Sequence, residues 1–209
     1  EHIAQGNLER LRQNPYPGRG IVIGESPNGD ITQVYWIMGR STNSRNRALV
    51  QEGDIVRTDL FDKSNAGDTS LIIYNAMRFE NNVHIVSNGD QTDTIAEFVR
   101  DHPLNGFDIA LRTRTYEPDD PNFTPRISGM SWLFRTSDET GVHTRAFNKL
   151  SIIRRGIDGN PIHEIFRLQI TLGIGYCIHT YSGDGNPLPS FTDRPYPVPV
   201  GDSIDETAD

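Results

Sequence analysis

Apolar and polar positions alternate along most of the chain, in short runs separated by turn residues. The runs 20–24 and 31–38 flank an Asn28-Gly29 pair, which supplies the positive φ angles of a tight hairpin. Runs of the same kind cover 55–60, 71–77, 83–87, 109–114, 127–135, 144–154, 162–172 and 174–181. The pattern therefore predicts successive strands, most of them joined by hairpins.

A helical period replaces the alternation in two places. Apolar residues three and four apart predict a helix over 92–101, with Thr92 or Asp93 as its N-cap. Residues 5–12 predict a short helix that ends before Pro15. Many strands with few helices indicate an α+β protein with mainly antiparallel sheets. The apolar run 71–73 predicts a strand buried on both faces.

We expect one domain over residues 1–209, with an N-terminal extension of about 1–14 and a proline-rich C-terminal segment of about 184–209. The proline-rich segment is either an ordered wrap or a linker. Ser203 and Glu206 form a capping box, which predicts a helix at the last residues. Because that helix starts so late and the chain begins without Met, we expect the native protein to be longer, the alternative being a frayed natural tail.

Composition narrows the class of protein. The net charge is −8, which argues against a nucleic-acid surface, and the sequence has no apolar run long enough to cross a membrane. Cys177 is the only cysteine of the sequence, so a cysteine-based metal cluster and an intrachain disulfide are excluded and a cytoplasmic setting is the default. Eighteen of the twenty cations are Arg, the side chain that best matches phosphate and carboxylate groups.

Several common catalytic motifs are absent from the sequence. The Gly18-x-Gly20 and Gly173-x-Gly175 pairs lack the third glycine of a dinucleotide fingerprint. The six His form no HxH or HExxH pattern, and no Gly-x-Ser-x-Gly elbow occurs. We therefore expect no metal site and no serine nucleophile.

The most unusual stretch covers residues 39–47, directly after a predicted strand. It holds three Arg and five hydroxyl or amide side chains and no large apolar residue. A solvated loop is one interpretation, and a phosphate site is the other, because charge-assisted donors and hydroxyls suit a phosphate. Arg19 adds a fourth cation.

Three other polar stretches stand near predicted strand ends, at Tyr74-Asn75, 88–93 and 116–120. Each also has a structural interpretation: a cross-strand tyrosine, a turn with an N-cap, and a solvated acidic loop.

Taken in order, these motifs resemble the archaeal-type IMP cyclohydrolase family over about half the chain. The residues that carry the resemblance are Tyr16-Pro17-Gly18-Arg19, Gly39-Arg40-Ser41 with Arg45, Tyr74-Asn75, Ser87-Asn88-Gly89 with Thr92-Asp93 and Ile95, Tyr116-Glu117 with Asp119-Asp120, and Thr124-Pro125-Arg126-Ile127. The resemblance implies a four-layer αββα sandwich similar to N-terminal nucleophile hydrolases, without an autocatalytic nucleophile. It implies closure of 5-formamidoimidazole-4-carboxamide ribotide to IMP with loss of water, in de novo purine synthesis.

The resemblance also implies roles for individual residues. Arg45 would stabilise the developing oxyanion, Tyr74 would donate or relay a proton, and Glu117 would orient the carboxamide or accept its proton. Phosphate contacts would come from Arg19, Arg40 and Ser41, and base or ribose contacts from Asn75, Asn88, Asp93 and Arg126. No metal or redox cofactor is implied, and the partners are a purine ribotide and further copies in a homo-oligomer.

Two other functions stay open at this point. One is a non-catalytic nucleotide or sugar-phosphate binding protein on the same fold, and the other is an amide hydrolase of the related fold, disfavoured by the lack of a nucleophile at the first residue. The family pattern does not include residues 1–14 or the segment after Gly183, and Arg78 stands where it has a Lys.

Overall fold

Eleven strands and five helices form within residues 2–65, 67–139 and 141–208, which the computed structural model describes. The smaller sheet consists of β1 (Arg19–Glu25), β2 (Ile31–Ile37), β10 (Ile174–His179) and β11 (Tyr196–Pro199). The larger sheet consists of β3 (Ala48–Glu52), β4 (Ile55–Asp59), β5 (Asn75–Glu80), β6 (Val83–Ser87), β7 (Arg126–Asp138), β8 (Gly141–Arg155) and β9 (Pro161–Leu168). The helices are α1 (His2–Arg12), α2 (Thr42–Arg45), α3 (Gln91–Asp101), α4 (Gly106–Leu111) and α5 (Ile204–Ala208), with a 3-10 turn at Lys63–Asn65.

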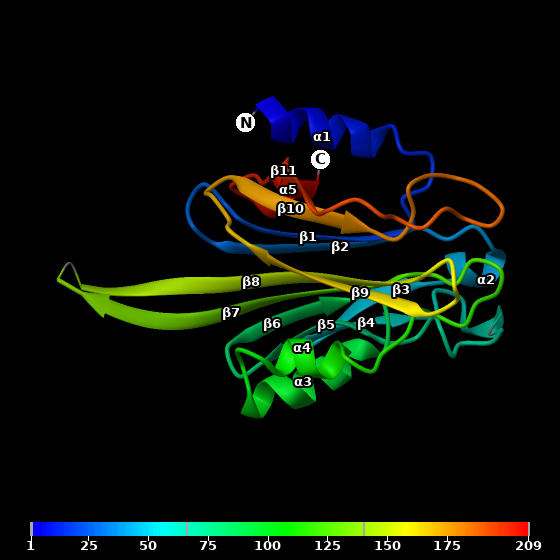
Figure 1. Ribbon diagram of the computed structural model, residues 1–209, viewed down its shortest axis with the longest axis horizontal. Coiled ribbons are helices and arrows are strands. Elements are labelled where there is room, and N and C mark those ends of the chain that lie inside the picture. The colour runs from blue at the N-terminus through cyan, green and yellow to red at the C-terminus, as the bar shows by residue number, and fades with distance from the viewer. Residues whose placement is uncertain (1, 66, 140, 209) are drawn as a thin grey trace.

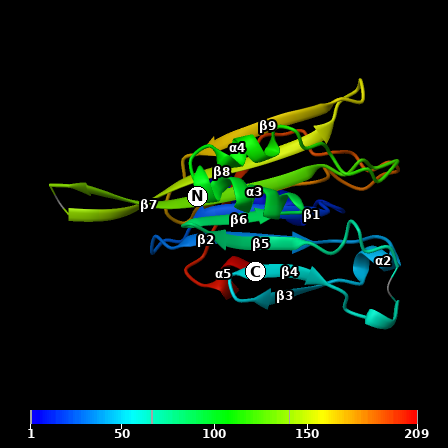
Figure 2. The same ribbon diagram turned by 90° about the horizontal axis from the view of Figure 1, so that it is seen from below.

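The two sheets lie face to face (Figure 1). Their strand orders are β11–β10–β1–β2 and β3–β4–β5–β6–β7–β8–β9, and neighbouring strands pair antiparallel. Helix α1 lies on the outer side of the smaller sheet, and α3 and α4 lie on the outer side of the larger sheet. Figure 2 shows β7 and β8 extending beyond the other strands. The predicted α+β class with mainly antiparallel sheets is confirmed.

Turn residues with positive φ angles form the β1–β2 hairpin and the β5–β6 hairpin. Gly29 has a φ of 86° between β1 and β2, and Asn81 and Asn82 have φ of 48° and 61° between β5 and β6. These left-handed conformations suit Gly and Asn and reverse the chain within a few residues. The hairpins set the register of the strands that carry the site described below.

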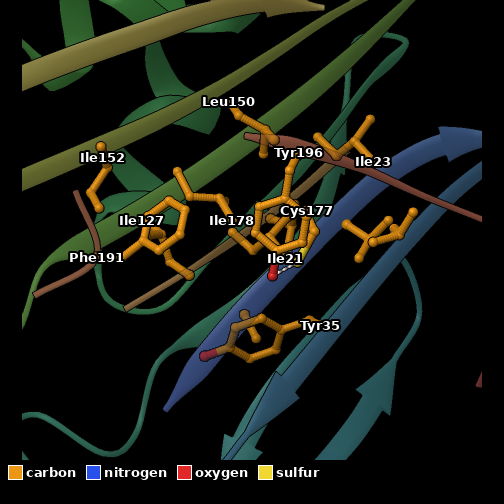
Figure 3. Packing of buried hydrophobic residues seen from close by; sticks show 14 of the residues in the cluster. Ile21, Ile23, Tyr35, Ile127, Leu150, Ile152, Cys177, Ile178, Phe191 and Tyr196 are labelled. Carbon is orange, nitrogen blue, oxygen red and sulfur yellow. Dashed lines mark hydrogen bonds between the residues drawn. The ribbon is translucent and has the colours of Figure 1, made fainter. Parts of the chain in front are cut away.

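Apolar side chains fill the space between the sheets (Figure 3). Ile21 and Ile23 of β1 are fully buried and belong to one cluster with Leu150 and Ile152 of β8. Each such side chain contributes about 1.5–3 kcal/mol through burial. This packing fixes β1, and with it Arg19, against the larger sheet.

The predicted strand over 109–114 is wrong, because its first half belongs to helix α4 and its second half is turn and irregular backbone. Phe107, Ala110 and Leu111 are spaced three and one apart, are almost fully buried, and pack in the cluster of α3 and the larger sheet. A short apolar run fits a buried strand and a buried helix equally well, and here the second helix covers the sheet.

The predicted strand over 71–77 is also wrong in its first half, since β5 begins at Asn75. Thr58 binds this segment through its side chain: its hydroxyl donates to the Ile72 carbonyl and accepts from the Tyr74 N–H. Residues 71–74 therefore form a turn that enters β5, and the run 71–73 is not a strand buried on both faces.

The ends of the predicted elements differ in smaller ways. Helix α3 begins at Gln91, so Thr92 and Asp93 lie inside it and neither is its N-cap. The helix predicted at the last residues is confirmed. The Ser203 hydroxyl accepts from the Glu206 N–H, while the Glu206 carboxylate accepts from the Asp202 N–H rather than from the Ser203 N–H of a full capping box. The proline-rich segment is ordered, with Phe191 buried and β11 paired to β10.

None of the described helices is both long and apolar enough to span a membrane.

Candidate active site

A buried ion pair joins the start of β1 to the loop between α4 and β7. Arg19 Nη1 and Nη2 donate to Glu117 Oε1 and Oε2 at 3.0 and 2.8 Å, and the two side chains are 10% and 4% exposed. Burial raises the pKa of Glu117, while the Arg19 guanidinium opposes that shift. Burial alone would lower the pKa of Arg19, but the Glu117 carboxylate keeps it above its usual value. The pair is thus a fixed cation beside a carboxylate with raised proton affinity.

The loop that carries Glu117 is held by its own hydrogen bonds. The Glu117 N–H donates to the Thr124 carbonyl at 2.9 Å, and the Thr124 N–H donates to Asp119 Oδ1 at 2.7 Å. The Thr124 hydroxyl also bonds the Asp119 carboxylate and the Tyr181 hydroxyl. This closed loop aims the Glu117 side chain inward.

Asn88 connects the pair to the larger sheet. Its carbonyl accepts from Arg19 Nη1 at 3.1 Å. Its side-chain amide donates to the Pro125 carbonyl and accepts from the Ile127 N–H and from Gln91 Nε2. The amide is therefore occupied by the protein, and the base contact predicted for Asn88 stays a prediction.

Two tyrosine hydroxyls meet between the sheets, one from β2 and one from the turn before β5. Tyr35 Oη and Tyr74 Oη are 2.6 Å apart, in side chains of residues only 8% and 7% exposed. Burial and Tyr74 raise the pKa of Tyr35, while Arg19 and Arg47 act in the opposite direction. The hydroxyl pair thus lies within electrostatic reach of both arginines. Sequence reasoning missed Tyr35, whose only signal is an aromatic with a polar tip at an inward position of β2.

A cavity of about 280 Å³ opens beside the ion pair. Its polar lining is rich in cations, hydroxyls and carboxylates, and comprises Tyr16, Arg19, Arg40, Ser41, Ser44, Arg47, Glu117, Asp119, Asn122, Thr124 and Tyr181. This volume is close to the range of small-molecule sites. Tyr74 is not part of the lining. Its hydroxyl interacts electrostatically with Arg19, which does line the cavity.

Four residues of the 39–47 stretch line the cavity: Arg40, Ser41, Ser44 and Arg47. Arg40 is exposed and its Nη1 donates to Asp184 and to the Gly185 carbonyl at 2.9 and 2.8 Å. The Ser41 hydroxyl accepts from the Ser44 N–H as the N-cap of α2. A short helix thus turns this stretch so that its arginines face different ways. Arg47, the third arginine of the stretch, is a lining residue that the sequence does not single out as a site residue.

Arg45 lies outside the cavity lining. Its side chain is exposed, and Nε donates to the Gly39 carbonyl at 2.8 Å. Its predicted role at an oxyanion stays a prediction that needs this side chain to turn inward.

Asn75 and Asp93 meet each other, but on the side of the larger sheet that α3 covers. Asn75 Nδ2 donates to both Asp93 carboxylate oxygens at 2.9 and 3.1 Å, and Arg78 Nη1 also contacts Asp93 at 3.2 Å. None of the three lines the cavity, and the ligand contacts predicted for Asn75 and Asp93 stay predictions.

Arg126 lies close to the ion pair without lining the cavity. Its Nη1 donates to Asp90 and to Gln91 Oε1, each at 2.7 Å, while its buried Nε has no partner among the described residues. Its charge acts to lower the pKa of Glu117.

Within the described ranges, no three His, Cys, Asp or Glu side chains gather as a metal site would require.

Fold and site together define an α+β protein of two antiparallel sheets. A cavity lined by arginines, of a size that suits a small molecule, lies at the N-terminal end of β1. The chain belongs to the family described as IMP cyclohydrolase-like protein, whose sequence profile matches residues 16–208. The expectation that the family pattern leaves out the segment after Gly183 is wrong, because the match runs through that segment.

Curated relatives with the name IMP cyclohydrolase come from several archaea. The protein of Methanothrix thermoacetophila is 36% identical over 118 residues, which are 55% of this chain and 57% of the relative. Those of Methanococcus aeolicus and Methanocaldococcus jannaschii are each 30% identical over 115 residues, 54% and 55% of this chain and 56% of each relative. The chain thus spans somewhat more than half the length of the curated relatives it matches.

Proposed function

We propose that the protein is an IMP cyclohydrolase, which closes the ribotide of 5-formamidoimidazole-4-carboxamide to IMP with loss of water. One observation carries the proposal: in a chain of this family, the buried Arg19–Glu117 pair lines a cavity rich in arginines, and the hydroxyls of Tyr35 and Tyr74 lie within electrostatic reach of Arg19. The names of the archaeal relatives support the same activity.

The reaction joins two amides of one molecule. The carboxamide nitrogen bonds to the formyl carbon and gives up one proton, and the formamido nitrogen gives up a second as the C–O bond breaks. Both protons leave on the formyl oxygen as water. Since both groups already belong to one substrate, the protein mainly has to select the reactive conformer, accept a proton and stabilise an oxyanion.

The cavity supplies groups for each of these tasks. We assign the phosphate to Arg40, Ser41 and Arg47, which line the cavity at the 39–47 stretch. Glu117 would orient the carboxamide or accept its proton, because burial has raised its pKa. Tyr74 would protonate the formyl oxygen, with Arg19 as the nearby cation. Arg45 would have to turn inward from the Gly39 carbonyl to add positive charge there.

The broader setting is part of the proposal. The layers of Figure 1 support a four-layer αββα sandwich similar to N-terminal nucleophile hydrolases. We propose one domain with an extension of about 1–14 and a C-terminal segment of about 184–209, in a cytoplasmic homo-oligomer of de novo purine synthesis. The aligned relatives support the pathway through their name.

A non-catalytic nucleotide-binding protein is the second candidate. It is favoured by the position of Tyr74 outside the cavity lining and by the engagement of both Glu117 oxygens with Arg19. The two functions differ in whether IMP is formed or only bound.

Incubation of the purified protein with the formylated ribotide should produce IMP, detected by absorbance and by chromatography of the product. Turnover should be unchanged by a chelator, because a dehydration needs no redox partner and the sequence has no metal-ligand motif. Tight IMP binding without IMP formation would establish the second candidate instead. Activity that is lost in chelator and restored by a divalent ion would contradict the metal-free reaction.

A further inference from the structure

The tyrosine pair contains one more proton than its own hydrogen bond uses. Each phenol can donate one hydrogen bond, and the two oxygens are 2.6 Å apart. One proton therefore lies between the oxygens. The other has no acceptor among the described residues, although both rings are buried between the sheets. A buried donor without a protein acceptor is a feature that a ligand can satisfy.

The surroundings of this spare proton favour a negatively charged acceptor. Arg19 and Arg47 both line the cavity, and both act electrostatically on the Tyr35 hydroxyl. The Glu117 carboxylate is already engaged by two N–H groups of Arg19. Donors and cations in a buried place are the arrangement that stabilises a developing oxyanion.

Neither tyrosine lines the cavity, but two observations favour Tyr74 over Tyr35 as the phenol with the spare proton. Of the two hydroxyls, that of Tyr74 has the stronger electrostatic interaction with Arg19, which lines the cavity. Tyr74 also follows Leu71 and Ile72, two further lining residues, whereas the β2 residues 31–37 do not line the cavity. A proton that reaches a bound molecule therefore comes from the Tyr74 side of the pair.

We infer that Tyr35 is a positioning residue: its O–H donates to Tyr74 Oη and so directs the Tyr74 proton toward the oxygen that leaves as water. The inference rests on the proposed cyclohydrolase function. In that step the Tyr74 O–H bond breaks as the proton passes to the formyl oxygen, and the proton released by the carboxamide nitrogen restores the phenol. The hydrogen bond from Tyr35 stabilises the Tyr74 oxygen between these transfers.

Tyr35→Phe tests the inference through turnover. It should lower kcat by about tenfold, the factor expected for one lost hydrogen bond, and leave KM nearly unchanged because Tyr35 does not touch the substrate. In a Tyr74→Phe background, Tyr35→Phe should cause no further loss, because its effect acts through the missing hydroxyl. A fluorotyrosine at position 35, which keeps the hydroxyl, should retain the wild-type kcat.

Tyr196→Phe is the matched control. Tyr196 is 7% exposed, and its hydroxyl accepts from Cys177 Sγ away from the cavity lining. Its kcat should equal that of the wild type. The inference is overturned if Tyr35→Phe keeps full kcat, or if it lowers kcat equally with and without the Tyr74 hydroxyl. If the wild type is active and either of these results is found, only the role of Tyr35 is refuted. If the wild type itself is inactive, the proposed function is refuted as well.

Discussion

Replacing Arg19 by Met should lower the free energy of unfolding by about 3–5 kcal/mol, because it leaves the Glu117 carboxylate buried without its cation. Arg19 and Glu117 share two hydrogen bonds at 3.0 and 2.8 Å, and their side chains are only 10% and 4% exposed, so most of the lost interaction is not restored by solvent. Denaturation in urea at pH 7, followed by circular dichroism, measures the loss.

The pH dependence of this loss has a definite sign. Burial already raises the pKa of Glu117 in the folded protein, and removal of Arg19 should raise it further. A folded-state pKa above the unfolded value favours the neutral carboxyl, so the variant is least stable, relative to the wild type, at high pH. The deficit should shrink as the pH falls from the pKa of Glu117 in the variant to its pKa in the wild type, which itself lies above the ordinary range of Glu.

Arg40→Met is the control for a lost arginine. Arg40 pairs with Asp184 at 2.9 Å, but the two side chains are 40% and 60% exposed. Such exposed pairs are worth about 0–1 kcal/mol. If Arg19→Met destabilises the protein no more than Arg40→Met does, the buried pair does not hold the site together.

The second large effect concerns turnover. Tyr74→Phe removes one hydroxyl and should lower kcat by about a hundredfold if general acid catalysis has its usual size. Glu117→Gln keeps the size of the side chain and removes its charge. It should lower kcat more than it weakens IMP binding, because the carboxylate is assigned to the transition state rather than to ground-state affinity.

Steady-state kinetics and calorimetric titration with IMP separate these two quantities. Tyr196→Phe serves as the comparison outside the cavity lining, since the Tyr196 hydroxyl accepts from Cys177 Sγ. Full turnover in both Tyr74→Phe and Glu117→Gln would refute the assigned roles and leave a binding protein as the better account.

Local signals explain how much of the fold the sequence predicts. Asn28-Gly29 and Asn81-Asn82 reverse the chain through their own conformational preferences. The Ser203 hydroxyl accepts from an N–H three residues further on, in the first turn of α5, so these features follow from neighbouring residues. The strand predicted over 109–114 fails because the apolar run is too short to show its period, and only packing against α3 makes it helical. The outcome there depends on contacts that no local pattern contains.

The site shows the same division. The 39–47 stretch is visible in the sequence because its arginines are adjacent, yet the sequence does not show that α2 turns Arg47 to the cavity and leaves Arg45 outside. Arg19 and Glu117 are 98 positions apart, and Tyr35 of β2 and Tyr74 of the turn before β5 are 39 positions apart. Such pairs form only when the sheets pack.

A crystal structure of the protein with bound IMP tests the location of the chemistry most directly. We predict the purine ring in the cavity beside Arg19, with its pyrimidine edge within about 2.6–3.2 Å of the Tyr74 hydroxyl or the Glu117 carboxylate. The phosphate should contact Arg40, Ser41 or Arg47. IMP bound only outside this cavity, for example in the groove lined by Arg10 and His179 beneath α1, would contradict the account.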